Sequence, residues 1–143
     1  MEITLTRPRC NSYNMTAVAS THTYVQLNRI TPEDQTGTSP MELLLEAVAG
    51  CASIDVILIL EEKGRASLTG YKVIASGRRV PPPATLRPFE AIDLHFVIDT
   101  DASASKVIRA IELSLEKYCS VASMLKGNVE ITYSLTLNGE KIK

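Results

Sequence analysis

The three cysteines are the residues of this sequence best suited to chemistry. Cys10, Cys51 and Cys119 form no Cys-x-x-Cys pair and their number is odd, so a secreted disulfide framework is not expected. In a reducing compartment a cysteine is either a small buried apolar residue or a reactive thiol. Two thiols that meet can do redox work, because one attacks a peroxide oxygen and the other converts the sulfenic acid into a disulfide. Cys51 and Cys119 are the candidates, with simple packing at a helix crossing as the alternative for each.

A thiol that attacks peroxide has to be a thiolate at neutral pH, which requires a nearby cation or several hydrogen-bond donors. Arg7, Arg9 and Arg29 flank predicted N-terminal strands and are the candidate cations, with a solvated surface position as the alternative for each. Asp55 lies four residues after Cys51 and shares its helical face, where a carboxylate disfavours the thiolate. We therefore expect Asp55 to pair with a cation or to accept from a backbone donor.

Metal and nucleotide chemistry have little support in the sequence. Cys10, His22 and His95 could be imagined as ligands of one metal ion, but no two of them have the spacing of a helical or knuckle ligand pair. No metal site is therefore expected. The sequence also contains neither a glycine-rich phosphate-binding motif nor the Gly-x-Ser-x-Gly motif of serine hydrolases.

The first cysteine of the candidate pair lies on the strongest predicted helix. Ser39-Pro40-Met41-Glu42 combines an N-cap serine, a proline at the first helical position and a glutamate three residues after the cap. The helix continues to about Lys63 and ends at Gly64. Its apolar residues lie nearly all round, so most of its sides must be covered. A 143-residue chain has little material for that, which predicts burial between the subunits of a homodimer.

The second cysteine of the pair follows another predicted helix, over about 103–118, which Asp101 or Ser103 caps. Its apolar stripe consists of Val107, Ile108, Ile111, Leu115 and Tyr118. Strands are predicted over 2–6, 13–19, 22–30, 70–78, 89–98 and 129–137, and a short helical piece over 120–126. The order βββ-α-ββ-α-β predicts an α+β fold. We expect one domain over 1–143, with an N-terminal β-meander over 1–38 and a helix-containing part over 39–143.

Composition excludes several classes of function. Lys and Arg total 15 against 16 Asp and Glu, a net charge of −1, and Trp is absent, so a nucleic-acid binder is not expected. Glu46 and Asp55 interrupt the longest apolar run, so no membrane span is expected. Met1 leads directly into an alternating strand pattern rather than a signal peptide, which predicts a cytoplasmic protein.

Two segments of the sequence resemble the OsmC-like family, which includes the organic-hydroperoxide-resistance (Ohr) branch. They are the central helix segment Ser39-Pro40-Met41-Glu42-Leu43-Leu44-Leu45-Glu46-Ala47-Val48-Ala49-Gly50-Cys51 and the second-cysteine segment Glu116-Lys117-Tyr118-Cys119-Ser120-Val121-Ala122-Ser123-Met124-Leu125. Their order and spacing are also similar, and the resemblance covers about 40–137. It is strongest to the YhfA-like subgroup, whose members carry Pro-Met-Glu and Tyr-Cys-Ser-Val.

The resemblance implies an OsmC-like fold in an intertwined homodimer, with the long central helices buried and two active sites at the subunit interface. It implies thiol-dependent reduction of organic hydroperoxides or hydrogen peroxide, with Cys51 as the peroxidatic and Cys119 as the resolving thiol. No bound cofactor is implied. Electrons come from an external dithiol, which is of the lipoyl type in the Ohr branch.

The resemblance also implies an activating pair beside the attacking thiol. The family's peroxidases carry a Glu directly after the helix-opening Pro, paired with an Arg. Here Met41 stands at that position and Glu42 follows one residue later, which turns the side chain by about 100°. Arg9 lies in the hairpin region of the Ohr-branch arginine, and Arg29 lies nearer the OsmC-branch position. We take Glu42 and Arg9 as the candidate pair, with Arg29 second.

Three functions remain open at this stage. The leading hypothesis is a cysteine-based hydroperoxide reductase, favouring alkyl hydroperoxides because of the Leu- and Ile-rich surroundings. The alternative is a non-catalytic small-molecule-binding or stress protein on the same scaffold, with a structural Cys51. A third is covalent catalysis on acyl substrates by Cys51, for which the fold would have to bring His22 or His95 close as a base.

Overall fold

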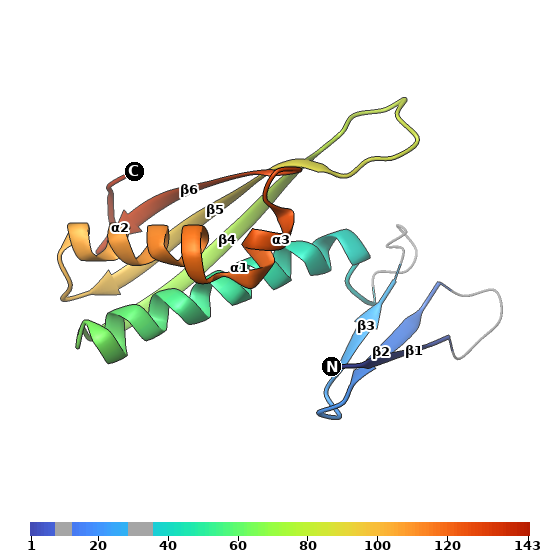
Figure 1. The fold of residues 1–143 in the computed structure, drawn as a ribbon, viewed down its shortest axis with the longest axis horizontal. Helices are drawn as coiled ribbons and strands as arrows, with labels where there is room; N and C mark the ends of the chain where they lie inside the picture. The colour runs from blue at the N-terminus through green and yellow to red at the C-terminus, as the bar shows by residue number, and fades with distance from the viewer. Residues whose placement is uncertain (8–12, 29–35) are drawn as a thin grey trace. The chain divides into compact units, whose positions relative to one another are not determined.

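The computed structural model describes residues 1–7, 13–28 and 36–143, which divide into two compact units, Met1–Leu44 and Leu45–Lys143 (Figure 1). The first unit contains a three-stranded antiparallel sheet in the order β1-β2-β3. Its strands are β1 Ile3–Thr6, β2 Met15–Ala19 and β3 Tyr24–Leu27. The predicted N-terminal meander is confirmed, with shorter strands than predicted. The candidates Arg9, Cys10 and Arg29 lie outside the described residues.

Helix α1 (Pro40–Ile57) begins with the predicted capping box. The Glu42 amide donates to Ser39 Oγ at 3.2 Å, and the Ser39 amide donates to a Glu42 carboxylate oxygen at 2.8 Å. Two amides that no helical carbonyl can reach are thereby satisfied. These hydrogen bonds from Ser39 hold the pKa of Glu42 below its usual value, because they favour the carboxylate.

Replacing Ser39 by alanine is expected to lower the free energy of unfolding by about 1 kcal/mol at pH 7, because one N-terminal amide loses its acceptor.

Glu42, whose folded-state pKa is lowered, contributes stability that is present above pH 4.5 and is lost as the pH falls through its folded-state pKa. The effect of Glu42→Ala should therefore shrink below pH 4.5. Urea denaturation of both variants and the wild type at several pH values measures these differences.

The predicted helix over 40–63 is confirmed in extent, but its last part differs in form. After Ile57 the chain continues as the π-helical segment η1 (Leu58–Lys63), and the Gly64 amide donates to the carbonyl of Ile59 at 2.8 Å. Such five-residue hydrogen bonds widen the helix locally. Gly64 ends the element, as predicted.

The second unit contains a four-stranded sheet in the order β4-β5-β6-β7. Strands β4 (Leu68–Arg79) and β5 (Phe89–Thr100) are antiparallel, β6 (Glu130–Leu137) runs parallel to β5, and β7 (Glu140–Lys141) is antiparallel to β6. The connection from β5 to β6 contains α2 (Ala104–Leu113), the π-helical segment η2 (Ser114–Tyr118) and α3 (Ser120–Leu125). Helices α1 and α2 lie along the same face of this sheet (Figure 1). The predicted α+β class and element order are confirmed, and β7 is an addition.

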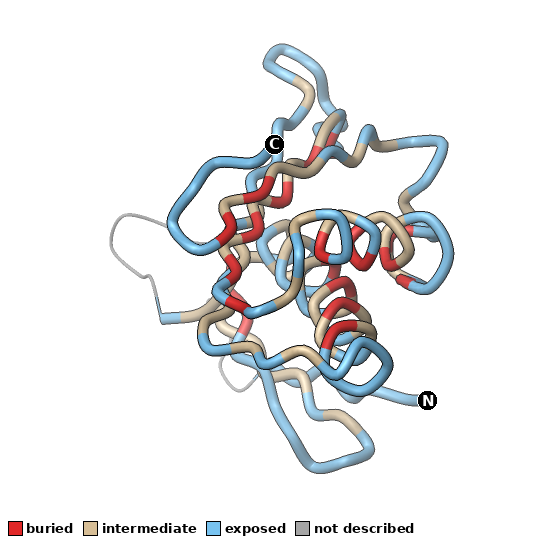
Figure 2. Tube along the Cα trace, turned by 90° about the vertical axis from the view of Figure 1, so that its left-hand side faces the viewer, coloured by how far each residue is buried: buried red, intermediate tan, exposed pale blue. Residues whose placement is uncertain are grey.

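The core of the second unit lies between this sheet face and the helices, where the buried positions gather (Figure 2). Strand β5 supplies every second residue, as a strand with one covered face does. The large apolar side chains that are fully buried are Ile92, Leu94, Phe96 and Ile98 from β5, Val48 and Val56 from α1, Val107 and Ile111 from α2, and Leu135 from β6. Of the two candidate caps for α2, Ser103 is confirmed at the N-cap, whereas Asp101 accepts from the Ser67 amide at 2.8 Å.

Helix α1 retains an exposed apolar stripe within this single chain. Ile54 is 62% exposed and Leu58 is 40% exposed, and Ala47 and Gly50 lie before them at the same helical spacing. By length and composition, Pro40–Lys63 is also a helix that could cross a membrane, a test that core helices of soluble proteins pass as well. The sheet and helices of the same unit therefore leave this apolar stripe of α1 uncovered.

Candidate active site

The first part of the site is one turn of α1. Cys51 and Asp55 are spaced i, i+4 on this helix, and both side chains are half-buried. Gly50, directly before Cys51, is exposed, and a Cβ atom added there would meet nothing within 4 Å. The backbone at Gly50, next to Cys51, is therefore open within the single chain.

The second part of the site is positioned by Ser114, the first residue of η2. Its side chain is fully buried, and its hydroxyl lies 3.1 Å from the Ala52 carbonyl oxygen and 3.4 Å from Asp55 Oδ2. The Cys119 amide donates to the Ser114 carbonyl at 2.8 Å, which closes the π-helical turn. Ser114 therefore fixes α1 to the segment that carries Cys119. Sequence reasoning missed it, although it lies three residues after Ile111 in the predicted apolar stripe.

Cys119 is the single residue between η2 and α3. Its backbone is extended, with φ −68° and ψ 102°, and the next helix, α3, begins at Ser120. Its sulfur accepts a hydrogen bond from the Ala122 amide at 3.3 Å and serves as the N-cap of α3. The side chain is only 2% exposed. Cys119 is therefore held in one orientation by both its backbone and its sulfur.

The structure brings the two predicted thiols together. Cys51 Sγ, Cys119 Sγ and one carboxylate oxygen of Asp55 all lie within 4.8 Å of one another. Both cysteines are free thiols. Within the described ranges the Asp55 carboxylate lies beside the Ser114 hydroxyl and the two sulfurs and forms no ion pair, so its expected pairing with a cation or a backbone donor across an interface stays a prediction.

The two sulfurs differ in environment. Burial raises the pKa of Cys119 to about 11, the Ala122 amide opposes this by donating to the sulfur, and the neighbouring Cys51 side chain raises it further. Cys119 is therefore a protonated thiol at neutral pH. Cys51 is the more accessible of the two.

An alkaline loss of stability is expected from this arrangement. In the unfolded chain Cys119 ionises near pH 9.0, whereas in the folded protein it keeps its proton until about pH 11. The raised folded-state pKa gives stability that is complete below pH 9 and is lost as the pH rises to 11. The unfolding free energy of the wild type should therefore fall more steeply over this range than that of Cys119→Ser. Equal slopes in urea titrations would contradict the raised pKa.

The predicted activating pair is only partly described. Glu42 is exposed, and its carboxylate is occupied in the capping box with Ser39, a role the sequence also predicted. Arg9 and its alternative Arg29 lie outside the described residues, and Arg7 is exposed. The catalytic roles of Glu42 and Arg9 therefore stay predictions.

His95, which the sequence offered as a base for Cys51, lies on the sheet and does not face the thiols. His95 alternates with the buried Leu94 and Phe96 on β5, so its ring lies on the sheet face away from the helices. Its ring nitrogens lie 2.8 Å from Ser134 Oγ and 3.2 Å from Thr136 Oγ1. His95 therefore cannot serve Cys51 as a base.

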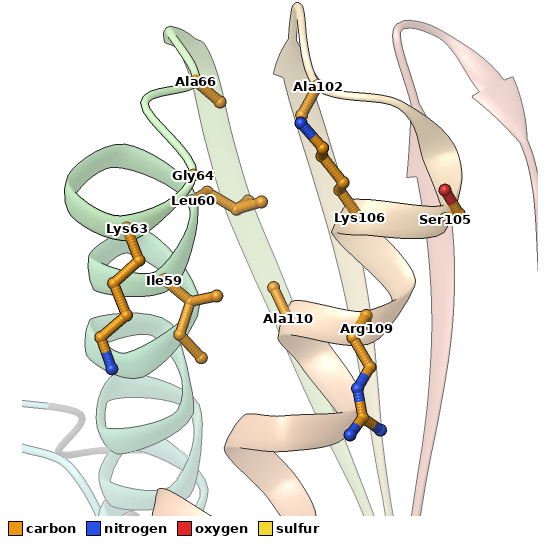
Figure 3. Close-up of a pocket in the computed structure, with 10 residues that line it drawn as sticks. All are labelled: Ile59, Leu60, Lys63, Gly64, Ala66, Ala102, Ser105, Lys106, Arg109 and Ala110. Atoms are coloured by element: carbon orange, nitrogen blue, oxygen red, sulfur yellow. The ribbon is translucent and has the colours of Figure 1, made fainter.

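A separate pocket of about 450 Å³ lies between the end of α1–η1 and the first turns of α2 (Figure 3). Its apolar lining comes from Ile59, Leu60, Ala66, Ala102 and Ala110.

Three cations, Lys63, Lys106 and Arg109, border this pocket (Figure 3). None of them forms an ion pair with the parts of the chain that the structure describes. The Lys63 ammonium lies 5.5 Å from the ring centre of Tyr118. Apolar walls beside unpaired cations suit a small molecule with an apolar body and an acidic group.

Comparisons with known proteins agree with the fold and the family. Residues 32–134 match the OsmC-like protein family. Protein YhfA of Escherichia coli (strain K12) is 47% identical over 98 residues, which cover 67% of this chain and 70% of that protein.

Solved structures share the same architecture. An OsmC-like protein from Mycoplasma pneumoniae has a TM-score of 0.80 at 20% identity, over 96% of this chain and 97% of its own. A Legionella pneumophila protein described as organic hydroperoxide resistance protein OsmC has a TM-score of 0.71 at 15% identity, over 94% and 95%. With its matched sequence, its three strands before the long helix and its α+β architecture, this chain belongs to the OsmC-like protein family.

Proposed function

We propose that this protein is a two-cysteine peroxidase that reduces organic hydroperoxides or hydrogen peroxide. The observation that carries the proposal is the pair of free thiols, Cys51 and Cys119, whose sulfurs lie within 4.8 Å of each other across two helical segments. A disulfide requires only that the sulfurs approach further, because the two residues already face each other. The description of the Legionella relative as an organic hydroperoxide resistance protein supports the same chemistry.

The unequal environments of the sulfurs assign their roles. Cys51 is half-buried and is the more accessible of the two thiols, so a peroxide reaches it first. Cys119 is 2% exposed, and burial raises its pKa to about 11, so it is a poor first nucleophile. Cys51 is therefore the peroxidatic thiol and Cys119 the resolving thiol.

The reaction balances with these two residues and one external reductant. The Cys51 thiolate attacks the distal peroxide oxygen, the O–O bond breaks, and the leaving alkoxide takes a proton to give an alcohol. The Cys119 sulfur then displaces hydroxide from the Cys51 sulfenic acid, which gives a disulfide and water. An external dithiol, of the lipoyl type in this proposal, reduces the disulfide by exchange and is itself oxidised, so no bound cofactor takes part.

Two residues from outside this cluster belong to the proposal. Arg9 stabilises the Cys51 thiolate, with Arg29 as the second choice, and Glu42 orients the arginine. The motif supporting Glu42 differs from the family pattern, since Met41 follows the helix-opening Pro40. Alkyl hydroperoxides are the preferred substrates because Leu and Ile residues of α1 line the proposed dimer interface.

The active form is proposed to be an intertwined homodimer in the cytoplasm. Ile54 and Leu58 leave an apolar stripe exposed on α1, and a second copy of the same stripe is its complement in a two-fold interface. This burial between subunits, rather than insertion in a lipid bilayer, accounts for the apolar composition of Pro40–Lys63.

Intact mass after one equivalent of cumene hydroperoxide tests the proposal. The reduced wild type should lose two hydrogens, Cys119→Ser should gain one oxygen, and Cys51→Ser should remain unchanged. An unchanged mass in all three proteins would overturn the peroxidase. Cys10→Ser is the matched control and should behave as the wild type does.

The pocket bordered by Lys63, Lys106 and Arg109 favours a second candidate function, the binding of a small apolar acid without catalysis. Isothermal titration with dodecanoate at low salt tests it. Binding should weaken on Arg109→Ala and Lys106→Ala, and should be unchanged in Arg78→Ala, a cation on β4 paired with Glu90 at 2.8 Å. The absence of any binding heat with the wild type would contradict this binding function.

A further inference from the structure

We propose that the reduced cysteine pair and Asp55 together form a binding site for a thiophilic divalent metal ion, Zn²⁺ by donor preference. The site combines two thiol sulfurs and one carboxylate oxygen, each able to give one ligand atom, and these atoms lie within 4.8 Å of one another. Thiolate and carboxylate ligands in a four-coordinate arrangement are typical of zinc, and soft sulfur donors discriminate against magnesium and calcium.

The separations require only a small closure. A tetrahedral zinc ion with bonds of about 2.3 Å to sulfur holds two sulfurs about 3.8 Å apart. The observed limit of 4.8 Å is therefore within about 1 Å of the bound arrangement. Asp55 and Cys51 come from one turn of α1, so their mutual distance is fixed by the helix. Cys119 is the ligand that closes onto them from the η2–α3 junction.

The surroundings also match those of a metal site. Metal ligands are usually oriented by outer hydrogen bonds. Here the Ala122 amide donates to Cys119 Sγ at 3.3 Å, and Ser114 Oγ lies 3.4 Å from Asp55 Oδ2. Within residues 1–7, 13–28 and 36–143 no Lys or Arg forms an ion pair with Asp55.

Binding is balanced by proton release. Each thiol gives its proton to solvent as its sulfur coordinates the ion, and Asp55 binds as the carboxylate. Three protein ligands leave a fourth position for water or an external ligand. No electron is transferred, so the metal site needs no oxidant or reductant.

One consequence rests on the proposed function. The disulfide between Cys51 and Cys119 uses the same sulfur electron pairs as the metal, so oxidation releases the ion and the bound ion blocks oxidation. Under this scheme, the metal-bound form is a resting state protected from peroxide.

Cobalt and zinc titrations of the chelator-treated, reduced full-length protein test the site. Co²⁺ should bind one per chain and give sulfur-to-metal charge-transfer absorption in the near ultraviolet. Zn²⁺ should displace it, with the affinity measured against a chromophoric chelator. Cys51→Ser and Cys119→Ser should each weaken zinc binding by about a hundredfold and reduce the absorption band, and Asp55→Asn should weaken it by at least about tenfold.

Matched controls separate this site from adventitious binding. Cys10→Ser removes the third thiol of the sequence, and Asp93→Asn removes a carboxylate that accepts from the Thr132 hydroxyl on the sheet. Both should bind as the wild type does. Circular dichroism confirms that each variant is folded. Absence of the charge-transfer band in the wild type, or its loss in Cys10→Ser with retention in Cys51→Ser, overturns the proposed site.

The outcomes for metal and peroxide are distinguishable. If reduced protein binds zinc but cumene hydroperoxide leaves its mass unchanged, the metal site stands and the peroxidase fails. If peroxide forms the disulfide but neither Zn²⁺ nor Co²⁺ binds, the metal site fails and the peroxidase stands. If both occur, zinc should slow disulfide formation in proportion to its occupancy, and a rate independent of zinc would contradict a shared site.

Discussion

Cys51→Ser is expected to lower hydroperoxide consumption by about a thousandfold or more, because the hydroxyl that replaces the sulfur is a far weaker nucleophile towards the peroxide oxygen. The substitution hardly changes the volume of the half-buried side chain, so the fold should persist. The measurement is the initial rate of cumene hydroperoxide loss with a lipoyl-type dithiol as reductant.

Two control variants accompany this measurement. Cys119→Ser should still react once, because Cys51 forms its sulfenic acid without a resolving thiol. Cys10→Ser should turn over at the wild-type rate. Substantial turnover by Cys51→Ser would assign the reaction to another residue, and an inactive wild type would instead favour the binding function at the basic pocket.

Ile54→Lys is expected to convert the proposed dimer into monomers. Ile54 is 62% exposed in the single chain, so the isolated subunit tolerates a charge there. In a two-fold interface each substitution occurs twice, and burying two unpaired ammonium groups costs about 4 kcal/mol in total. The dimer dissociation constant should therefore rise by about a thousandfold. Sedimentation equilibrium over a concentration series measures it.

Ile74→Lys is the matched control for this change, since Ile74 is 44% exposed on β4 rather than on α1. It should leave the association unchanged. A wild type that is monomeric at all concentrations would refute the dimer. If Ile54→Lys and Ile74→Lys raised the dissociation constant equally, the interface would extend beyond the α1 stripe.

Features determined by neighbouring residues could be predicted from the sequence. The start of α1 follows from Ser39, Pro40 and Glu42, whose capping interactions span only three residues. Strand β5 follows from the alternation of its apolar residues. The hairpin to β7 was also within reach, because Asn138-Gly139, with φ values of 50° and 82°, is a typical tight-turn pair.

Features that depend on residues distant in the sequence could not be predicted. The partner of Asp55 depends on how η2 packs on α1, which no local pattern encodes. The same holds for the three-atom cluster, because Cys119 joins Cys51 and Asp55 only after the chain returns through two strands and a helix. Ser103 rather than Asp101 caps α2 because the Asp101 carboxylate accepts from the Ser67 amide, which lies just before β4 and is distant in the sequence.

The π-helical turn that joins Ser114 to Cys119 restricts how this segment can change in length. The bond from the Cys119 amide to the Ser114 carbonyl, at 2.8 Å, encloses one residue more than an ordinary helical turn does. Deleting one residue there would restore α-helical spacing and rotate the following sulfur by about 100°, away from Cys51. The connection over 80–88 contains no helical turn, and the hydrogen bond from the Val80 amide to the Pro88 carbonyl at 3.0 Å joins only its two ends. Single-residue insertions and deletions should therefore be tolerated between β4 and β5 but not between α2 and α3.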